Sequence, residues 1–356
     1  MVHAIRRTLF LLTALVATSA TGGSGEERLP PSSEGSFSIA VIPDTQAYRG
    51  RGAKATPLSL APVTNAIFDA HTQWIVDNLD AQRIVFVSHV GDIVDRNEPE
   101  QWAVARQAMD RLHGRVPYAI ALGNHDLKAS GDAALFQKHF PAERFVGVPW
   151  YGGTPSAGLD ARYGNNANSF QLFSAGGLDF VMLHLECNAP DPVLQWADKV
   201  LAEHASRRAI VASHMNLGPL AQPKKPDDYF AAPKGRMQWK KVHGAAGNTP
   251  QQMWDKCFRR HANVFLILSG DQSRTQALRQ VSQNDAGRPV HEVLSDYMAT
   301  TGSGDCWMRI CRFLPAENRI DVFTIDSRTG QLCPGTKLVP QRDAHQFSLP
   351  YRMSGA

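Results

Sequence analysis

Five short apolar segments of the sequence each end in side chains that can bind a metal ion. They read SIAVIPD (38–44), IVFVSHVGD (84–92), AIALGNHD (119–126), IVASH (210–214) and LILSGD (266–271). Apolar runs of this length, bounded by glycine, aspartate or asparagine, are typical of buried strands. We therefore expect five strands that deliver their terminal polar side chains to one edge of a sheet.

The order of the elements indicates the fold class. Helical patterns alternate with the early strands; between 67 and 79, for example, apolar residues recur at helical spacing. After residue 271 the segments ALRQV, HEVLSDYM, WMRICRF and RIDVFTID predict four short strands joined by turns. The sequence thus predicts an α/β protein with βα units first and an antiparallel half after residue 271.

Two helix starts are predicted from capping residues. Thr249 and Gln252 form a capping-box pattern, and Asn97 with Glu100 forms a similar one. In this pattern the first side chain accepts a hydrogen bond from the helix and the second bonds back to the cap. We expect helices to begin directly after Asn97 and Thr249.

The N-terminal residues predict export. Arg6 and Arg7 precede a short apolar run, and small residues follow up to position 20. This is the layout of a cleavable signal over residues 1–20, and the run is too short for a membrane anchor. A twin-arginine route is an alternative that only the arginine pair supports. We expect a periplasmic or secreted protein with no membrane contact after cleavage.

Composition sets the remaining boundaries. Residues 21–36 are rich in glycine, serine, proline and charge, which predicts a flexible linker. The expected domain covers residues 37–330. Residues 331–356 show little periodicity, so we expect them to form a C-terminal tail.

Removing residues 1–20 takes away two arginines and no acidic residue, so the formal charge falls from +4 to +2. That balance indicates no nucleic-acid partner, and the sequence predicts no oligomeric state.

The five cysteines all follow the predicted signal. An exported protein with five cysteines can form two disulfides and keep one thiol. Their scatter lacks the paired spacing of a zinc–thiolate site. Cys306 and Cys333 both flank the last predicted strands, so we favour them for one bridge.

Residues 218–248 form a long insertion rich in proline, glycine and basic residues. Its charged residues are Lys224, Lys225, Lys234, Arg236, Lys240 and Lys241 against Asp227 and Asp228. Because the insertion directly follows the strand that ends at His214, it can lie over the strand ends and attract an anionic substrate. A solvated loop without a role is the equal alternative.

The donor types at the strand ends indicate the metal. Carboxylates, an amide oxygen and an imidazole suit divalent cations such as manganese, iron, zinc or magnesium. An aspartate shared by two ions holds them roughly 3.5 to 4 Å apart, the arrangement used in phosphoryl transfer. Asp92 is the natural shared ligand.

The blocks PDTQ, GDIVDRN and GNHD, in this order, resemble those of the calcineurin-like metallophosphoesterases. VASH and SGDQS supply the remaining blocks, so the resemblance covers about residues 37 to 325. It implies a four-layer α/β/β/α sandwich and a metal-dependent phosphoric ester hydrolase. The implied reaction is direct attack of a metal-bound hydroxide on phosphorus.

The resemblance also implies a role for each matching residue. His125 falls on the catalytic acid, Asp126 on the residue that orients it, and Asp95 and Arg96 on the acidic residue and the arginine of the pattern. The implied metal ligands are Asp44, Gln46, Asp92, Asn124, His214 and Asp271, with Ser273 closing the last block.

Three positions depart from the family pattern. Gln46 stands where the first block has histidine, and Asp271 and Ser273 stand where the last block has two. Oxygen donors replace three imidazoles, which favours manganese, magnesium or iron over zinc, with one or two ions bound. His89 and His184 are expected to be packed inside the fold, and Glu186 and Asn188 can line the site.

The sequence as a whole predicts an exported phosphoesterase that acts on phosphate monoesters or diesters. A non-catalytic protein that binds a metal or a phospho-ligand on the same scaffold is the alternative, because of the three departures. A surface module whose basic insertion meets anionic polymers is the third possibility.

Overall fold

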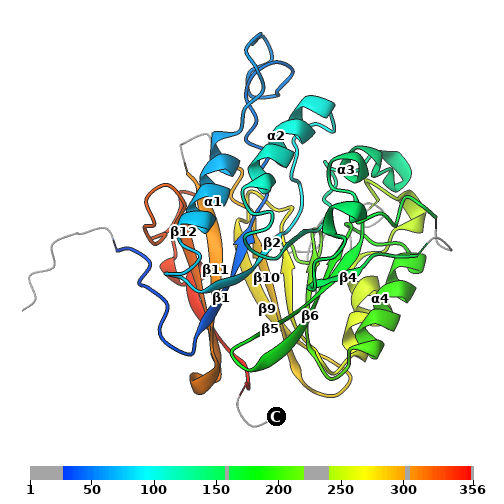
Figure 1. The fold of residues 1–356 in the computed structure, drawn as a ribbon, viewed down its shortest axis with the longest axis vertical. Coiled ribbons are helices and arrows are strands. Elements are labelled where there is room, and N and C mark those ends of the chain that lie inside the picture. The colour runs from blue at the N-terminus through cyan, green and yellow to red at the C-terminus, as the bar shows by residue number, and fades with distance from the viewer. Residues whose placement is uncertain (1–26, 157–159, 220–239, 301–304, 354–356) are drawn as a thin grey trace, which may run out of the picture.

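The computed structural model describes residues 27–156, 160–219, 240–300 and 305–353 of the 356-residue chain. The predicted export signal and most of the basic insertion lie outside the described residues. Two β-sheets form the centre of the molecule (Figure 1). None of the helices in the described ranges is both long and apolar enough to cross a bilayer.

The first sheet has six strands in the order β13-β12-β11-β1-β2-β3. Strands β1, β2 and β3 are parallel, whereas β11, β12 and β13 extend the sheet in antiparallel pairs. The strands are β1 (Phe37–Ile42), β2 (Ile84–His89), β3 (Tyr118–Ile120), β11 (Trp307–Leu314), β12 (Arg319–Asp326) and β13 (Gln346–Pro350).

The second sheet has seven strands in the order β4-β5-β6-β7-β8-β10-β9. Its central strands β6, β7, β8 and β10 are parallel. The strands are β4 (Tyr151–Gly153), β5 (Ser169–Ala175), β6 (Leu178–Leu185), β7 (Arg208–Ser213), β8 (Val264–Ser269), β9 (Ala277–Gln283) and β10 (Pro289–Ser295).

Helices cover the outer faces of both sheets. They are α1 (Ala66–Asp77), α2 (Pro99–Asp110), α3 (Ala134–His139), α4 (Asp191–Glu203) and α5 (Pro250–Lys256). Strand β1 explains the layering: Ile39 and Val41 join the core between the sheets, while Ala40 and Ile42 pack towards α1 and α2. A third core joins α4 and α5 to the second sheet. The predicted four-layer α/β/β/α fold is confirmed.

The four strands predicted after residue 271 are present, but they do not form one antiparallel half. β9 pairs with β10, and β11 pairs with β12, each antiparallel. The first pair joins the second sheet through β8, and the other joins the first sheet through β1. The β9–β10 pair therefore extends the second sheet beyond β8, and the β11–β12 pair extends the first sheet beyond β1.

The predicted helix caps give one success and one error. Thr249 and Gln252 form the capping box at the start of α5. Helix α2 instead begins after Glu98, with Pro99 in its first turn. Asn97 is used elsewhere, because its side chain accepts a hydrogen bond from Trp102 and donates to the carbonyl of Asp126, both at 2.8 Å.

Both ends of the predicted domain need correction. Residues 27–36 of the expected flexible linker are held against the fold: Leu29 is buried, and Arg312 donates to the Pro30 carbonyl at 2.7 Å. The expected C-terminal tail contains β13, in which Leu349 pairs with Ile320 of β12. The segment 346–350 is too short for its pattern of apolar residues to identify it as a strand.

The predicted disulfide is wrong. All five cysteines belong to the described residues, and all are buried free thiols. The Cys306 sulfur contacts the Ser327 hydroxyl at 3.3 Å and the Ile67 carbonyl at 3.9 Å instead of another sulfur. The thiols are therefore packing groups in this fold.

Candidate functional site

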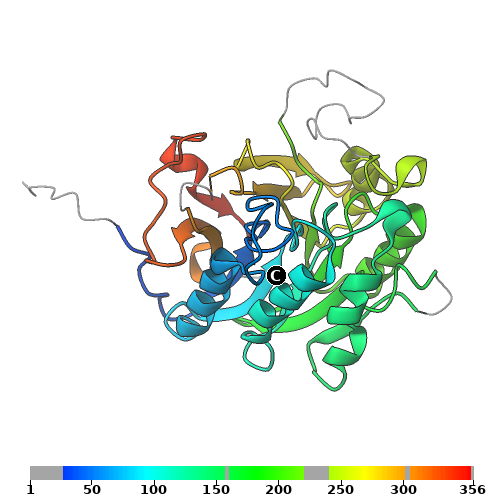
Figure 2. The same cartoon turned by 90° about the horizontal axis from the view of Figure 1, so that it is seen from above.

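Polar side chains from the ends of both sheets meet at one place. Asp44 follows β1, Asp92 follows β2, and His214 follows β7. One ligand atom from each of these three residues lies within 4.8 Å of the others, and all three residues are buried. We call them the central cluster. Seen from above, the blue loop between β1 and α1 lies near the middle of the molecule (Figure 2).

The ring of His214 is fixed in a defined orientation. Its Nδ1 atom donates to the carbonyl of Val90 at 3.0 Å. Its Nε2 atom faces three carboxylates, at 3.3 Å from Asp92 and 3.8 Å from Asp271 and 3.9 Å from Asp44. Because Nδ1 is occupied by a backbone carbonyl, Nε2 is the atom available to a metal ion.

Two buried atoms of the central cluster make no hydrogen bond to any described residue. They are Asp44 Oδ1 and His214 Nε2, and the nearest charge to the second atom is the Asp92 carboxylate at 3.3 Å. Unsatisfied buried polar atoms are costly, so a group that accepts electron pairs from both atoms is the physical solution. An arrangement of carboxylate oxygens and one imidazole nitrogen fits a divalent cation.

Glycines allow the loops to approach this closely. A side chain at Gly123 would overlap Asp92, and one at Gly270 would overlap Asp44. These are the glycines of the predicted GNHD and SGD blocks. Their function here is to leave space for the carboxylates of the neighbouring loops.

The charges in the site compete. Burial raises the pKa of Asp44 well above its ordinary value, and the charge of Asp296 raises it further. Burial opposes ionisation of Asp92 as well, but His214 and the His125 amide hold its pKa below the ordinary range. The carboxylates around His214 raise its pKa although burial acts in the other direction. A cation at this position would relieve the crowding of negative charge.

Asp296 is a buried carboxylate whose charge acts on the central cluster, and sequence reasoning missed it. It follows β10, is buried, and burial raises its pKa to about 7. Its charge also acts on Asp44. The signal was present in the sequence, because HEVLSD ends in an aspartate after an apolar strand, as four of the other five segments do.

Two further predicted ligands lie beside the central cluster. Asp271 follows β8, and burial raises its pKa to about 6. The Asn124 amide lies between Asp271 and Lys241: with its nitrogen towards Asp271 it donates at 2.9 Å, and its oxygen accepts from the Lys241 ammonium. Lys241 belongs to the basic insertion, for which the sequence leaves open a place over the strand ends or a solvated loop without a role, and this lysine lies at the site.

The positions that depart from the family pattern behave differently. Gln46 turns its amide nitrogen to the site and donates to Asp92 Oδ2 at 2.7 Å. Ser273 is half-buried in the turn after Asp271. Gln46 thus supports the carboxylate of Asp92 by a hydrogen bond, whereas the sequence predicts that its amide oxygen binds the metal.

His125 lies at the solvent-facing side of the site. Its side chain is 25% exposed, and its Nε2 atom lies 3.9 Å from Asp92 Oδ2. Its Nδ1 atom donates to the backbone carbonyl of Asp95 at 2.7 Å, and its backbone amide donates to Asp92 Oδ1 at 2.9 Å. The backbone of residue 95 therefore orients the ring.

Asp126 does not bond to the His125 ring, in contrast to the role that the resemblance implies. Its carboxylate is fully buried and accepts from the backbone amides of Gly123 at 2.8 Å and Val94 at 3.1 Å. It therefore braces the two loops that carry the site. Asp95 pairs with Lys54 at 2.6 Å, and Arg96 is exposed to solvent.

A buried acid–base pair lies at the end of β6. Glu186 Oε2 is 3.1 Å from His243 Nε2, and both side chains are almost fully buried. The other oxygen of Glu186 accepts from Asn168 at 2.9 Å. The sequence predicts that Glu186 can line the site. It gives no indication that His243, which lies in the insertion, forms this pair.

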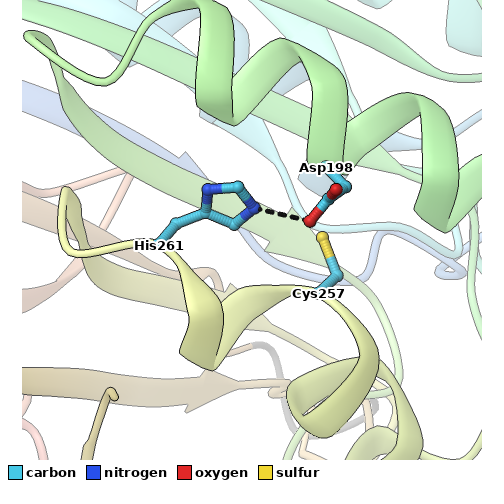
Figure 3. A group of neighbouring side chains, drawn as sticks. All are labelled: Asp198, Cys257 and His261. Carbon is cyan, nitrogen blue, oxygen red and sulfur yellow. Dashed lines mark hydrogen bonds and ion pairs between the residues drawn. The ribbon is translucent and has the colours of Figure 1, made fainter. Parts of the chain in front are cut away.

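A second group of possible metal ligands lies on the outer helices, and we call it the outer cluster. It consists of Asp198 on α4, Cys257 directly after α5, and His261 (Figure 3). His261 bonds to Asp198 at 2.9 Å, and Arg260 lies 3.4 Å from the same oxygen. Burial raises the pKa of the Cys257 thiol, which keeps it protonated.

His89 and His184 are buried and hydrogen-bonded, as predicted. His89 bonds to Thr45 at 3.0 Å, and His184 bonds to Ser88 at 2.9 Å and Gln171 at 2.8 Å. Burial lowers the pKa of both rings to about 3, so both are neutral at physiological pH. They support the strands beneath the site.

Comparison with known proteins gives relatives of low identity. The uncharacterized protein YvnB of Bacillus subtilis (strain 168) is 28% identical over 306 residues, which are 84% of this chain and 20% of YvnB. The 5'-nucleotidase of Candida albicans SC5314 has a TM-score of 0.46 at 13% identity, with 86% of this chain and 54% of that chain covered. The 5'-nucleotidase precursor of Thermus thermophilus has a TM-score of 0.39 at 15% identity, with 84% and 53% covered.

The chain therefore spans about a fifth of the length of YvnB and about half the length of the two nucleotidases. A family model described as calcineurin-like phosphoesterase matches residues 37–246. This match takes in the ends of β1, β2, β3 and β7, and it covers more than half of the chain. The protein belongs to the calcineurin-like phosphoesterase family.

Proposed function

We propose that this protein is a metal-dependent phosphoesterase whose active site is the central cluster with Asn124, His125 and Asp271. The observation that carries the proposal is the meeting of one ligand atom each from buried Asp44, Asp92 and His214 within 4.8 Å, where Asp44 Oδ1 and His214 Nε2 make no hydrogen bond to a described residue. A site that only stabilised the fold would satisfy these atoms within the protein.

The chain offers ligands of the right kind for one or two divalent ions. Asp44, Asp92, Asn124, His214 and Asp271 would hold them, with Asp92 in the central position. A bound ion supplies a lowered pKa for water and positive charge opposite the phosphoryl oxygens. Since most of the donors are oxygens, we propose manganese, magnesium or iron rather than zinc.

His125 is proposed as the general acid. The Asp95 carbonyl accepts from Nδ1 at 2.7 Å, which fixes the ring and directs Nε2 towards the cluster. In the protonated ring Nε2 carries the proton that is donated to the leaving oxygen. The partial exposure of His125 gives a leaving group access from solvent.

The test is turnover of p-nitrophenyl phosphate and bis(p-nitrophenyl) phosphate by the mature chain in the presence of Mn²⁺, with His125→Ala in parallel. We expect the wild type to hydrolyse at least one ester and the variant to retain about 1% of the rate or less. Equal rates for the two proteins would remove His125 from the mechanism.

The alternative is a non-catalytic protein that binds a metal or a phospho-ligand. The hydrogen bond from Gln46 to Asp92 Oδ2 favours it, because this bond occupies an oxygen of the central ligand. If no ester is hydrolysed while Mn²⁺ still binds with defined stoichiometry, this alternative replaces the proposed activity.

Export is also a proposal, and it rests on residues 1–20 alone. The expected mature protein begins after the small residues that end at position 20. Mass spectrometry of the protein recovered from periplasmic or culture fractions tests it. A chain that retains residues 1–20 in the cytoplasm would contradict export.

A further inference from the structure

We propose that Lys241 binds a non-bridging oxygen of the substrate's phosphoryl group and thereby makes the site prefer phosphomonoesters over phosphodiesters. This inference rests on the proposed function and adds the substrate class to it. It concerns a residue of the basic insertion that lies outside every block of the family pattern.

The position of Lys241 relates it to the site. Its ammonium group contacts the Asn124 amide, and the other end of that amide lies 2.9 Å from Asp271. The positive charge of Lys241 also acts on the carboxyl of Asp271. Lys241 thus contacts Asn124, one of the residues proposed to hold the metal, and is one side chain away from Asp271, another of them.

The segment that follows Lys241 is held firmly. Val242 is buried and its carbonyl accepts from the Ser130 amide at 2.9 Å. His243 forms the buried pair with Glu186 at 3.1 Å. A side chain at Gly131 would collide with His243, so the glycine is required for this contact.

The end of the segment is fixed as well. Asn248 donates through its backbone amide to the Asn188 carbonyl at 3.1 Å, and Asn188 donates through its side chain to the Asn248 carbonyl at 3.0 Å. These contacts attach residues 242–248 to the end of β6. The backbone next to Lys241 is therefore part of the site's framework.

Lys241 differs from the other lysine near the site. Lys54 is neutralised by Asp95 at 2.6 Å. No carboxylate of the described residues lies within ion-pair distance of Lys241, whose side chain is exposed. An exposed ammonium group beside a metal-binding site, without a carboxylate partner, is suited to bind an anionic ligand.

The number of charges on the ligand then decides the preference. A phosphomonoester carries close to two negative charges near neutral pH and has three non-bridging oxygens. A diester carries one charge and has two such oxygens. Because a metal site would bind phosphoryl oxygens, the third charged oxygen of a monoester would remain for the Lys241 ammonium group, and a diester lacks that oxygen.

The experiment compares wild type, Lys241→Gln and Lys240→Gln by kcat/KM for p-nitrophenyl phosphate and bis(p-nitrophenyl) phosphate with Mn²⁺. Lys240→Gln is the matched control, since it removes the same charge from the adjacent residue. For Lys241→Gln we expect kcat/KM for the monoester to fall about 10- to 100-fold, mainly through KM, and that for the diester about threefold or less. Inhibition by orthophosphate should weaken in parallel.

Several outcomes would overturn the inference. They are an equal loss on both esters, an unchanged monoester rate, or the same loss in Lys240→Gln. Thermal unfolding of the three proteins checks that the variants are folded. If the wild type hydrolyses neither ester, the proposed function fails, and calorimetric binding of orthophosphate to the Mn²⁺-loaded proteins still decides the role of Lys241: unchanged affinity in Lys241→Gln would exclude it.

Discussion

The central and outer clusters contain similar ligand types, but they differ in how their polar atoms are satisfied. In the outer cluster, Asp198 is bonded to His261 and lies near Arg260, so its charge is balanced within the protein. In the central cluster, Asp44 Oδ1 and His214 Nε2 are buried without a hydrogen bond to any described residue, and three carboxylates surround the one imidazole. The proximity of ligand-type side chains is thus a weak indication of a metal site, and unsatisfied buried atoms are a stronger one.

The largest difference in turnover is expected between the variants Asp92→Asn in the central cluster and Asp198→Asn in the outer cluster. Asp92→Asn removes a charge from the centre of the proposed metal site, so turnover should fall roughly 10³-fold or more. Asp198→Asn should leave turnover near the wild-type value. Metal content by mass spectrometry and ester hydrolysis are the measurements, and equal metal loss in the two variants would contradict the comparison.

A smaller effect is expected from the two histidines His125 and His261. His125→Ala should lower turnover by about 10²- to 10⁴-fold, because the proposed general acid is lost. Its metal content should remain unchanged, since the His125 ring is not among the proposed ligands. His261→Ala serves as the control and should retain activity. Loss of bound metal in His125→Ala would show that this histidine acts as a ligand.

The gain in stability on metal binding shows which of the two clusters binds the ion, without any activity assay. Saturation with Mn²⁺ at about 100 times the dissociation constant should add about 2.7 kcal/mol to the free energy of unfolding. Cys257→Ala should show the same gain, because the outer cluster is not expected to bind the ion. Denaturant unfolding measures the gain, and a thiolate-to-cobalt absorption band that disappears in Cys257→Ala would place a metal in the outer cluster.

The smallest effect is expected on the pH dependence of stability. It concerns His184, a buried histidine whose two ring nitrogens both have hydrogen-bond partners. Burial lowers the pKa of His184 from 6.5 to about 3, so the folded protein binds its proton less readily than the unfolded chain. Its contribution to stability is complete above pH 6.5 and is lost as the pH falls towards 3. The slope should be at most about 1.4 kcal/mol per pH unit. Urea unfolding between about pH 5 and 7 should show a shallower slope for His184→Gln, and an unchanged slope would contradict this.

Much of the fold and part of the site could be predicted from the sequence. The strand ends are recognisable because apolar runs give way abruptly to glycine and aspartate, as in LILSGD. Within each sheet the convergence of strand ends follows from the common direction of the parallel strands, as for Asp44 and Asp92 in the first sheet. The meeting of these two residues with His214 also needs the packing of the second sheet against the first. Asp296 follows the same rule, and it was missed because it belongs to no block of the family pattern.

Other features depend on contacts that the sequence does not encode locally. Asp126 neighbours His125 in sequence, yet the turn directs its carboxylate to the amides of Gly123 and Val94. Lys241 lies in an insertion without periodicity, and its position depends on the buried pair of Glu186 and His243. The orientation of Gln46 is set by the charge of Asp92. Each of these outcomes is decided by tertiary packing.

The pairing of β1 with β11 has a consequence for biosynthesis. Phe37 lies opposite Phe313, so the centre of the first sheet joins residues that are far apart in the sequence. A ribosome must therefore make the chain beyond Phe313 before this pairing can form, and contacts of such long sequence separation form slowly. Until then β1 has an unpaired edge, and an unpaired edge favours association with other chains.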